Sequence, residues 1–193
     1  MNVKAWLKKR PSVDEVRPAR CPGCGAASRP VGLPLVLWGH GGRDRQLRGP
    51  VDPGTDPQVL VFSGRRYLCR ACGAVAMAVP REVVSRRQFS GAAIALALAL
   101  LGIGSQPAHE VRRRVSPWRN FAACKHEGWS TLRRWLTAIR QGRLWPQLGC
   151  SELSGSVRAL AERVAQALIA RAPVAQAEQP REHQAFHGAI HMA

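Results

Sequence analysis

The segments Cys21-Pro-Gly-Cys24-Gly25 and Cys69-Arg-Ala-Cys72-Gly73 decide the fold of this 193-residue sequence. Each is a Cys-x-x-Cys pair followed by a glycine, which lets the chain turn so that backbone amides face the sulfur atoms. The two pairs together supply four thiolates, the number that a tetrahedral zinc site requires. We therefore expect one structural Zn²⁺ ion, held by Cys21, Cys24, Cys69 and Cys72.

A redox function is the alternative interpretation of each Cys-x-x-Cys pair. A redox pair normally opens a helix that follows a strand, and neither segment has that setting in the sequence. Catalytic zinc is disfavoured because four thiolates leave no open coordination position. Four arginines flank the pairs and are expected to offset the negative charge of a loaded site: Arg20, Arg29, Arg66 and Arg70.

The 44 residues between Cys24 and Cys69 leave room for the strands of a zinc ribbon. The predicted strands are 33–38, 43–48, 58–62, 65–68 and 74–79, separated by turns at 39–42 and 63–64 and an exposed loop at 49–57. We accordingly expect a zinc ribbon over residues 19–80. The basic, polar residues 1–18 are expected to form a flexible arm.

Helical patterns follow Pro80. Residues 91–101 are apolar on nearly all sides, which predicts a buried helix capped by Ser90. The whole apolar run, 91–104, has 14 residues and is shorter than the roughly 20 that cross a bilayer, so we expect no membrane span. Further helices are predicted at 105–115, 128–141 and 154–170. The expected fold is α+β: the ribbon, a helix-turn-helix-like bundle over 81–150, and a C-terminal helix with a disordered tail over 151–193.

The formal net charge of +17 indicates a polyanionic partner. Aspartate is absent beyond residue 56. Metal-dependent phosphodiester chemistry needs several converging carboxylates, so we expect no catalytic activity. Paired cysteines favour metal over disulfides in a reducing compartment, and no secretory signal is visible, so a cytoplasmic, nucleoid-associated protein is expected.

The helix predicted around Trp129–Arg140 has apolar residues on one face and arginines elsewhere. That division suits a recognition helix in duplex DNA, although an ordinary amphipathic helix with a solvated basic face has the same pattern. The candidate nucleic-acid contacts are Arg65, Arg66, Arg112, Arg113, Arg114, Ser130, Thr131, Arg133, Arg134 and Arg140.

Single cysteines and a spaced set of histidines lie outside these patterns. Cys124 and Cys150 are single. Cys124 and His126 resemble a ligand pair, but we favour a small buried thiol and a surface histidine as their interpretation. His183, His187 and His191 recur every four residues, so a helix would align them. In a sparse tail we expect no more than a weak, adventitious metal affinity from these histidines.

The sequence resembles the N-terminal half of bacterial insertion-sequence transposases and a related family of zinc ribbon plus helix-turn-helix proteins. The matching segments, within residues 20–146, are Cys-Pro-Gly-Cys-Gly at 21–25, Arg-Arg-Tyr-Leu-Cys-Arg-Ala-Cys-Gly at 65–73, Pro80, the helix from Ser90, Gly-Trp-Ser-Thr-Leu-Arg-Arg-Trp at 128–135 and Gly-Arg-Leu-Trp-Pro at 142–146.

The resemblance implies binding to transposon ends or related DNA by the ribbon and the helices together. In full transposases a carboxylate-bearing nuclease domain follows, and this sequence has no such constellation. We therefore expect an accessory protein, a regulator or a remnant, acting as a homodimer or with a separate transposase subunit. The alternatives are a partial transposase or nuclease, and an RNA- or protein-binding zinc ribbon scaffold.

Overall fold

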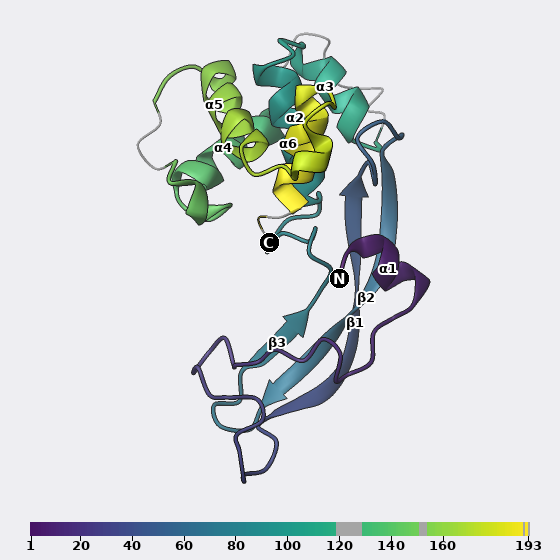
Figure 1. Cartoon of the computed structure of the whole chain (residues 1–193), viewed down its shortest axis with the longest axis vertical. Helices are drawn as coiled ribbons and strands as arrows, with labels where there is room; N and C mark the ends of the chain where they lie inside the picture. The colour runs from purple at the N-terminus through teal and green to yellow at the C-terminus, as the bar shows by residue number, and fades with distance from the viewer. Residues whose placement is uncertain (119–128, 151–153, 191, 193) are drawn as a thin grey trace. The chain divides into compact units, whose positions relative to one another are not determined.

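The computed structural model describes residues 1–118, 129–150, 154–190 and 192. The fold is α+β, with a three-stranded antiparallel sheet in the order β1-β2-β3 (Figure 1). Its strands are β1 (Leu37–Gly49), β2 (Gln58–Cys69) and β3 (Val75–Ala78). The chain divides into two compact units. Unit 1 comprises residues 1–46 and 61–81, and unit 2 comprises residues 47–60 and 82–193.

Two long strands replace the short ones expected from the sequence. The turns predicted at 39–42 and 63–64 are wrong, because both segments continue inside β1 and β2. Gly41 has a φ of +76°, so the chain bends there without leaving the strand. The last predicted strand, 74–79, is confirmed as β3, which pairs with β2 through Tyr67 opposite Ala76.

The flexible arm predicted for residues 1–18 is also wrong. This segment contains helix α1 (Val3–Lys8), whose Val3 and Trp6 are buried. Residues 1–18 form hydrogen bonds to alternate residues of β2, whose side chains point to the same side of the sheet. The indole of Trp6 donates to the carbonyl of Ser63, Arg65 donates to Pro11, and the Tyr67 hydroxyl donates to Val13. These contacts are long-range, so the local sequence does not reveal them.

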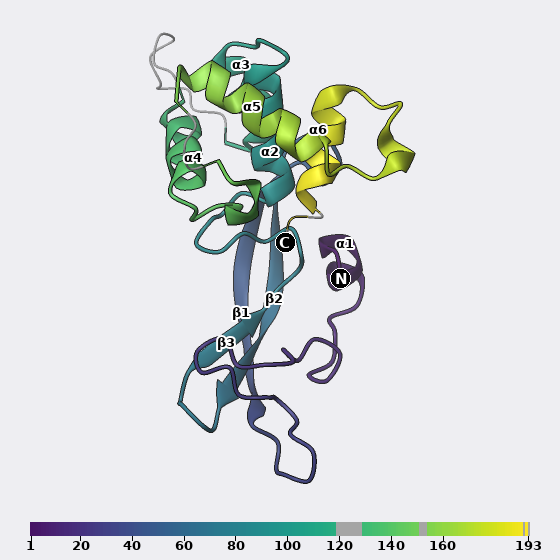
Figure 2. The same cartoon turned by 60° about the vertical axis from the view of Figure 1, so that its left-hand side comes forward.

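Unit 2 is a helical bundle centred on α2 (Gly91–Gly102), every residue of which is buried. The expected buried helix and its Ser90 cap are confirmed, since the Ser90 hydroxyl accepts from the Ala93 amide at 2.9 Å. Around α2 lie α3 (Ala108–Val115), α4 (Ser130–Arg140), α5 (Val157–Ile169) and α6 (Arg181–Ile190) (Figure 2). Short 3₁₀ turns occur at Pro146–Leu148 and Val174–Gln176.

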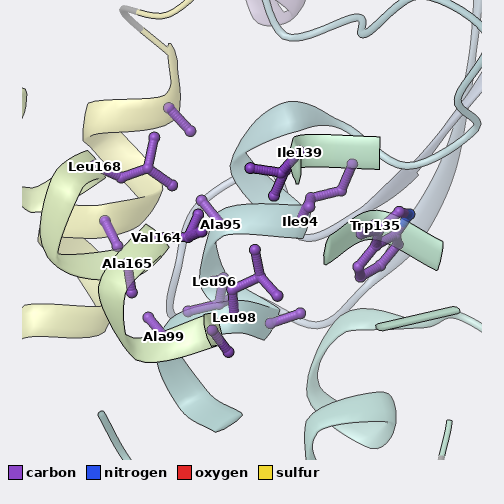
Figure 3. Close-up of a cluster of buried hydrophobic side chains, with 14 of the residues drawn as sticks. Ile94, Ala95, Leu96, Leu98, Ala99, Trp135, Ile139, Val164, Ala165 and Leu168 are labelled. Atoms are coloured by element: carbon purple, nitrogen blue, oxygen red, sulfur yellow. The ribbon is translucent and has the colours of Figure 1, made fainter. Parts of the chain in front are cut away.

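The core of unit 2 forms where α2 meets its neighbours. Side chains of α2 such as Ile94 and Leu96 lie among Trp135 and Ile139 of α4 and Val164 and Leu168 of α5 (Figure 3). The disordered tail expected after Pro173 is wrong, because α6 buries Phe186 against α2 and α5. Alanine and glycine make this packing possible, since their small size lets helices approach closely.

The predicted start of α3 needs a smaller correction. Pro107 precedes the helix as its N-cap residue, and Ser105 has a φ of +51° and provides no cap. Among the described residues, none of the helices combines the length and apolar character that a bilayer span requires.

Candidate metal centre

The four paired cysteines converge in unit 1. Their sulfur atoms all lie within 4.8 Å of one another, with Cys21 Sγ 3.7 Å from Cys72 Sγ and Cys24 Sγ 3.8 Å from Cys69 Sγ. Each of these two short distances joins one cysteine from each pair. The arrangement therefore brings together four soft ligand atoms that the sequence separates by up to 51 residues.

Each Cys-x-x-Cys-Gly segment folds into the same turn. The Cys21 amide donates to Ala26 at 2.9 Å and the Gly25 amide donates to Cys21 at 2.8 Å. In the second turn the Cys69 amide donates to Ala74 at 2.9 Å and the Gly73 amide donates to Cys69 at 2.8 Å. Gly25 and Gly73 have φ values of +74° and +72°, a region that other residues adopt only with strain. The glycine after each pair is thus a structural requirement.

The two turns are joined to the sheet and to each other by backbone hydrogen bonds. The second turn continues from β2, and its Arg70 amide donates to Val36 at 2.9 Å, just before β1. The Val36 amide in turn donates to Ser28 at 2.9 Å, which lies beyond the first turn. The segment before β1 therefore connects the two turns and helps to hold their sulfur atoms at a fixed separation.

The cluster is half buried. Cys21 and Cys69 are 2% and 1% exposed and pack with Leu37 and Tyr67 in a small apolar core, whereas Cys24 and Cys72 are exposed. Two of the four members of that core are cysteines. A core of this size stabilises a unit weakly, and a bound metal ion is the usual supplement in small domains.

The cysteines differ in their acidity. Hydrogen bonds from the amides of Cys24 and Gly23 lower the pKa of the Cys21 thiol to about 7. At Cys72 the Ala74 amide favours the thiolate, but the neighbouring sulfur atoms of Cys24 and Cys69 outweigh it and raise the pKa to about 12. Neighbouring thiolates repel one another, so the four sulfurs do not ionise together unless a cation compensates their charge.

The arginines expected to offset this charge have other contacts as well. Arg20 donates to the Gly25 carbonyl at 3.1 Å and so braces the first turn. Arg29 pairs with Asp14, and the guanidinium of Arg70 lies 5.1 Å from the ring centroid of Trp38. The Arg70–Trp38 pair is a feature that sequence reasoning missed, because nothing in the spacing links the second turn to the start of β1.

The candidate nucleic-acid residues lie on separate elements. Arg65 is half-buried through its bond to Pro11, and Arg66 lies on the opposite side of β2. On α3, Arg113 is paired with Glu110 at 2.6 Å, Arg112 is half-buried and Arg114 is exposed.

Helix α4 brings several candidates together on one exposed face: Ser130, Arg133, Arg134 and Arg140, joined by Thr137. Thr131 is half-buried. The opposite face of α4 is buried, and Trp135 packs edge-to-face with Trp129 and Phe89 at centroid distances of 5.1 and 5.2 Å. That aromatic cluster fixes the rotation of the helix about its axis, and hence which side chains it exposes.

The remaining candidate ligands do not assemble into a site among the described residues. Cys150 is buried in unit 2, and its thiol donates to the Leu148 carbonyl at 3.6 Å. His183 and His187 lie on α6, while Cys124 and His191 lie outside the described residues.

Searches of protein-family models, characterised proteins and solved structures return no match to this chain.

Proposed function

We propose that Cys21, Cys24, Cys69 and Cys72 hold one structural zinc ion, so that unit 1 is a zinc ribbon. The support is the spacing of the sulfur atoms. A tetrahedral ion with Zn–S bonds of about 2.3 Å has ligand atoms about 3.8 Å apart. The separations of 3.7 and 3.8 Å between sulfurs of different pairs match that edge length. Four thiolates complete the coordination, so the ion has a structural function and no catalytic one.

We further propose that the protein binds duplex DNA without catalysing a reaction, with helix α4 as the recognition helix of a helix-turn-helix-like bundle. The observation that carries this proposal is the exposed face of α4, where Arg133, Arg134 and Arg140 lie beside hydroxyl side chains. The helix contains no acidic residue. An α-helix fits the major groove, where arginine contacts phosphates and guanine edges.

The overall charge supports the same proposal. The chain carries 29 Lys and Arg residues against 12 acidic ones, an excess that favours a polyanion. The lack of aspartate beyond residue 56 argues against a self-contained nuclease site on the helices of unit 2. We propose a role as an accessory protein or a regulator of transposition because residues 20–146 resemble insertion-sequence transposases.

The proposal is tested by measuring binding of a labelled duplex over a range of salt concentrations. We expect the association constant to fall steeply with salt, because bound phosphates release counterions. Replacing both Arg133 and Arg134 with Gln should weaken binding about tenfold or more. It should also reduce the slope of log K against log salt concentration by the amount expected for about two lost phosphate contacts.

A matched control is Arg163→Gln, which removes one positive charge from an exposed position on α5. This control should change the affinity by less than about twofold, because a lone charge away from the bound duplex contributes little. If the control and the α4 variant lost equal affinity per positive charge removed, α4 would not be the recognition helix. Absence of duplex binding at low salt would contradict the proposal altogether.

A further inference from the structure

An exposed tryptophan lies beside the metal centre with its orientation fixed. Trp38, the second residue of β1, is 48% exposed. Its indole N–H donates to the Leu35 carbonyl at 2.6 Å, and the Arg70 guanidinium lies 5.1 Å from its ring centroid. The hydrogen bond and the cation–π contact already restrict the rotation of the indole. A ligand that stacks on the ring therefore costs little additional side-chain entropy.

The partner arginine is built into the second metal-binding turn. Arg70 follows Cys69, and its amide donates to the Val36 carbonyl two residues before Trp38. The backbone position of Arg70 beside Trp38 therefore depends on the turn that Cys69 and Cys72 form. A substitution or metal loss that alters this turn should also alter the Trp38–Arg70 contact.

Trp38 lies on the side of the sheet opposite to the N-terminal segment. Leu37 is buried, and a Cβ on Gly39 would be 2.8 Å from Val13, so these two residues face the N-terminal segment. Side chains alternate along a strand, so Trp38 faces the other way. By the same alternation, Arg66 and Leu68 point away from Tyr67, and Val75 opposite Leu68 is 49% exposed.

This side carries apolar and cationic side chains together. Trp38, Leu68 and Val75 lie there with the cations Arg66 and Arg70. A polyanion therefore meets favourable charge here, and it must also present a flat apolar surface to the indole.

A single-stranded nucleic acid meets both requirements, because its bases expose their faces while its backbone is anionic. Bases in a duplex are stacked on each other and do not. We propose that Trp38 and Arg70 form a binding site for an unpaired nucleobase, which stacks on the indole while Arg70 contacts the adjoining phosphate. This inference rests on the proposed function in nucleic-acid binding and extends it to a single-stranded segment.

The test compares short labelled oligothymidine with a duplex, using the zinc-loaded full chain. Trp38→Ala should weaken oligothymidine binding about 5- to 100-fold, the range expected for loss of one base–aromatic stack, and leave duplex affinity within about twofold. Trp38→Phe should retain most of the affinity, because phenylalanine preserves a stacking face. Arg70→Gln should weaken binding and make the remaining affinity less dependent on salt, because one phosphate contact is lost.

Trp118→Ala is the matched control, since Trp118 is also an exposed tryptophan, 53% accessible, with an arginine, Arg48, 5.3 Å from its ring centroid. It lies in unit 2 and should leave oligothymidine binding unchanged. Zinc content and melting temperature, measured on each variant, separate loss of the site from loss of the fold.

Three outcomes would overturn the inference. Trp38→Ala with full zinc content and unchanged oligothymidine affinity would show that no base stacks there. An equal loss in Trp118→Ala would remove its specificity. Trp38-dependent sedimentation with anionic phosphatidylglycerol vesicles, without oligothymidine binding, would identify a lipid surface instead. Loss of duplex binding in the Arg133 and Arg134 double variant bears on the proposed function alone, because those residues lie on α4 and not at this site.

Discussion

The hydroxyl of Tyr67 donates a 2.7 Å hydrogen bond to the backbone carbonyl of Val13, 54 residues earlier in the chain. The ring is fully buried in the small core that includes Cys21 and Cys69. One side chain thus joins the N-terminal segment, the sheet and the cysteine cluster. Its removal is the most direct way to measure how strongly residues 1–17 are attached.

We expect Tyr67→Phe to destabilise unit 1 by about 1–2 kcal/mol, because the change removes a hydrogen bond and leaves the Val13 carbonyl without its partner. Urea unfolding of the zinc-loaded protein measures this cost. Limited proteolysis should show faster cleavage within residues 1–17. An unchanged unfolding midpoint and cleavage rate would mean that the segment is held by its other contacts alone.

The same residue gives a pH prediction. Burial raises the pKa of Tyr67 above its ordinary value, despite the nearby Arg17 cation. A raised pKa means that the folded state favours the protonated phenol, so this stability is complete below the unfolded pKa of about 10 and is lost as pH rises through the folded value. Tyr67 is the single tyrosine of the sequence, so tyrosinate absorbance reports it alone. Titration at an ordinary pKa would contradict the burial.

Metal loading is tested with a pair of cysteine variants. The purified protein should contain about one zinc ion per chain, and Cys69→Ser should lose it and unfold unit 1, because metal binding and folding are coupled in a site of this size. Cys150→Ser is the matched control, since Cys150 is a buried thiol of unit 2. It should keep the full zinc content. Zinc retained in Cys69→Ser, or iron found in place of zinc, would refute the assignment.

A glycine substitution tests the C-terminal packing. A Cβ on Gly188 of α6 would overlap the Leu168 carbonyl oxygen of α5. Gly188→Ala should therefore destabilise unit 2 by about 3 kcal/mol or more, although alanine normally favours a helix over glycine by about 1 kcal/mol. Gly54→Ala, where a Cβ meets nothing within 4 Å, is the control and should be nearly neutral. Circular dichroism melts compare the two.

The cysteine cluster could be predicted from the sequence because its signal is local and repeated. Each turn is encoded within five residues, and a doubled Cys-x-x-Cys-Gly pattern is typical of a four-thiolate metal site. The buried helix 91–102 could be predicted for a similar reason, since its apolar residues surround the whole helix. The apolar stripe of α5 is equally plain: Leu160, Val164 and Leu168 recur at helical spacing and are buried.

The wrong predictions concern segments whose structure is decided by distant residues. Glycines at 39–42 indicate a turn when the local sequence is considered alone. In the structure their lack of a side chain lets the N-terminal segment pack closely against β1. A Cβ on Gly39 would contact Val13, and a Cβ on Gly42 would contact Arg10. The prediction of a disordered tail is wrong for the same reason. Its composition is polar, yet Phe186 and Ala189 of α6 find a complete apolar surface on α2 and α5. Neither partner surface is visible from a window of local sequence.

The path of the chain through the two units limits how the protein can be divided. Strands β1 and β2 each begin in one unit and end in the other, and residues 47–60 complete the helical unit, where Gly49 approaches Ala93 and Arg48 bonds to Gln88. A fragment that starts at residue 82 would lack residues 47–60, and a fragment that stops at residue 81 would contain them without the helices that they pack against. No single cut of the chain therefore yields both units intact, so we expect the two units to be expressed and inherited as one piece.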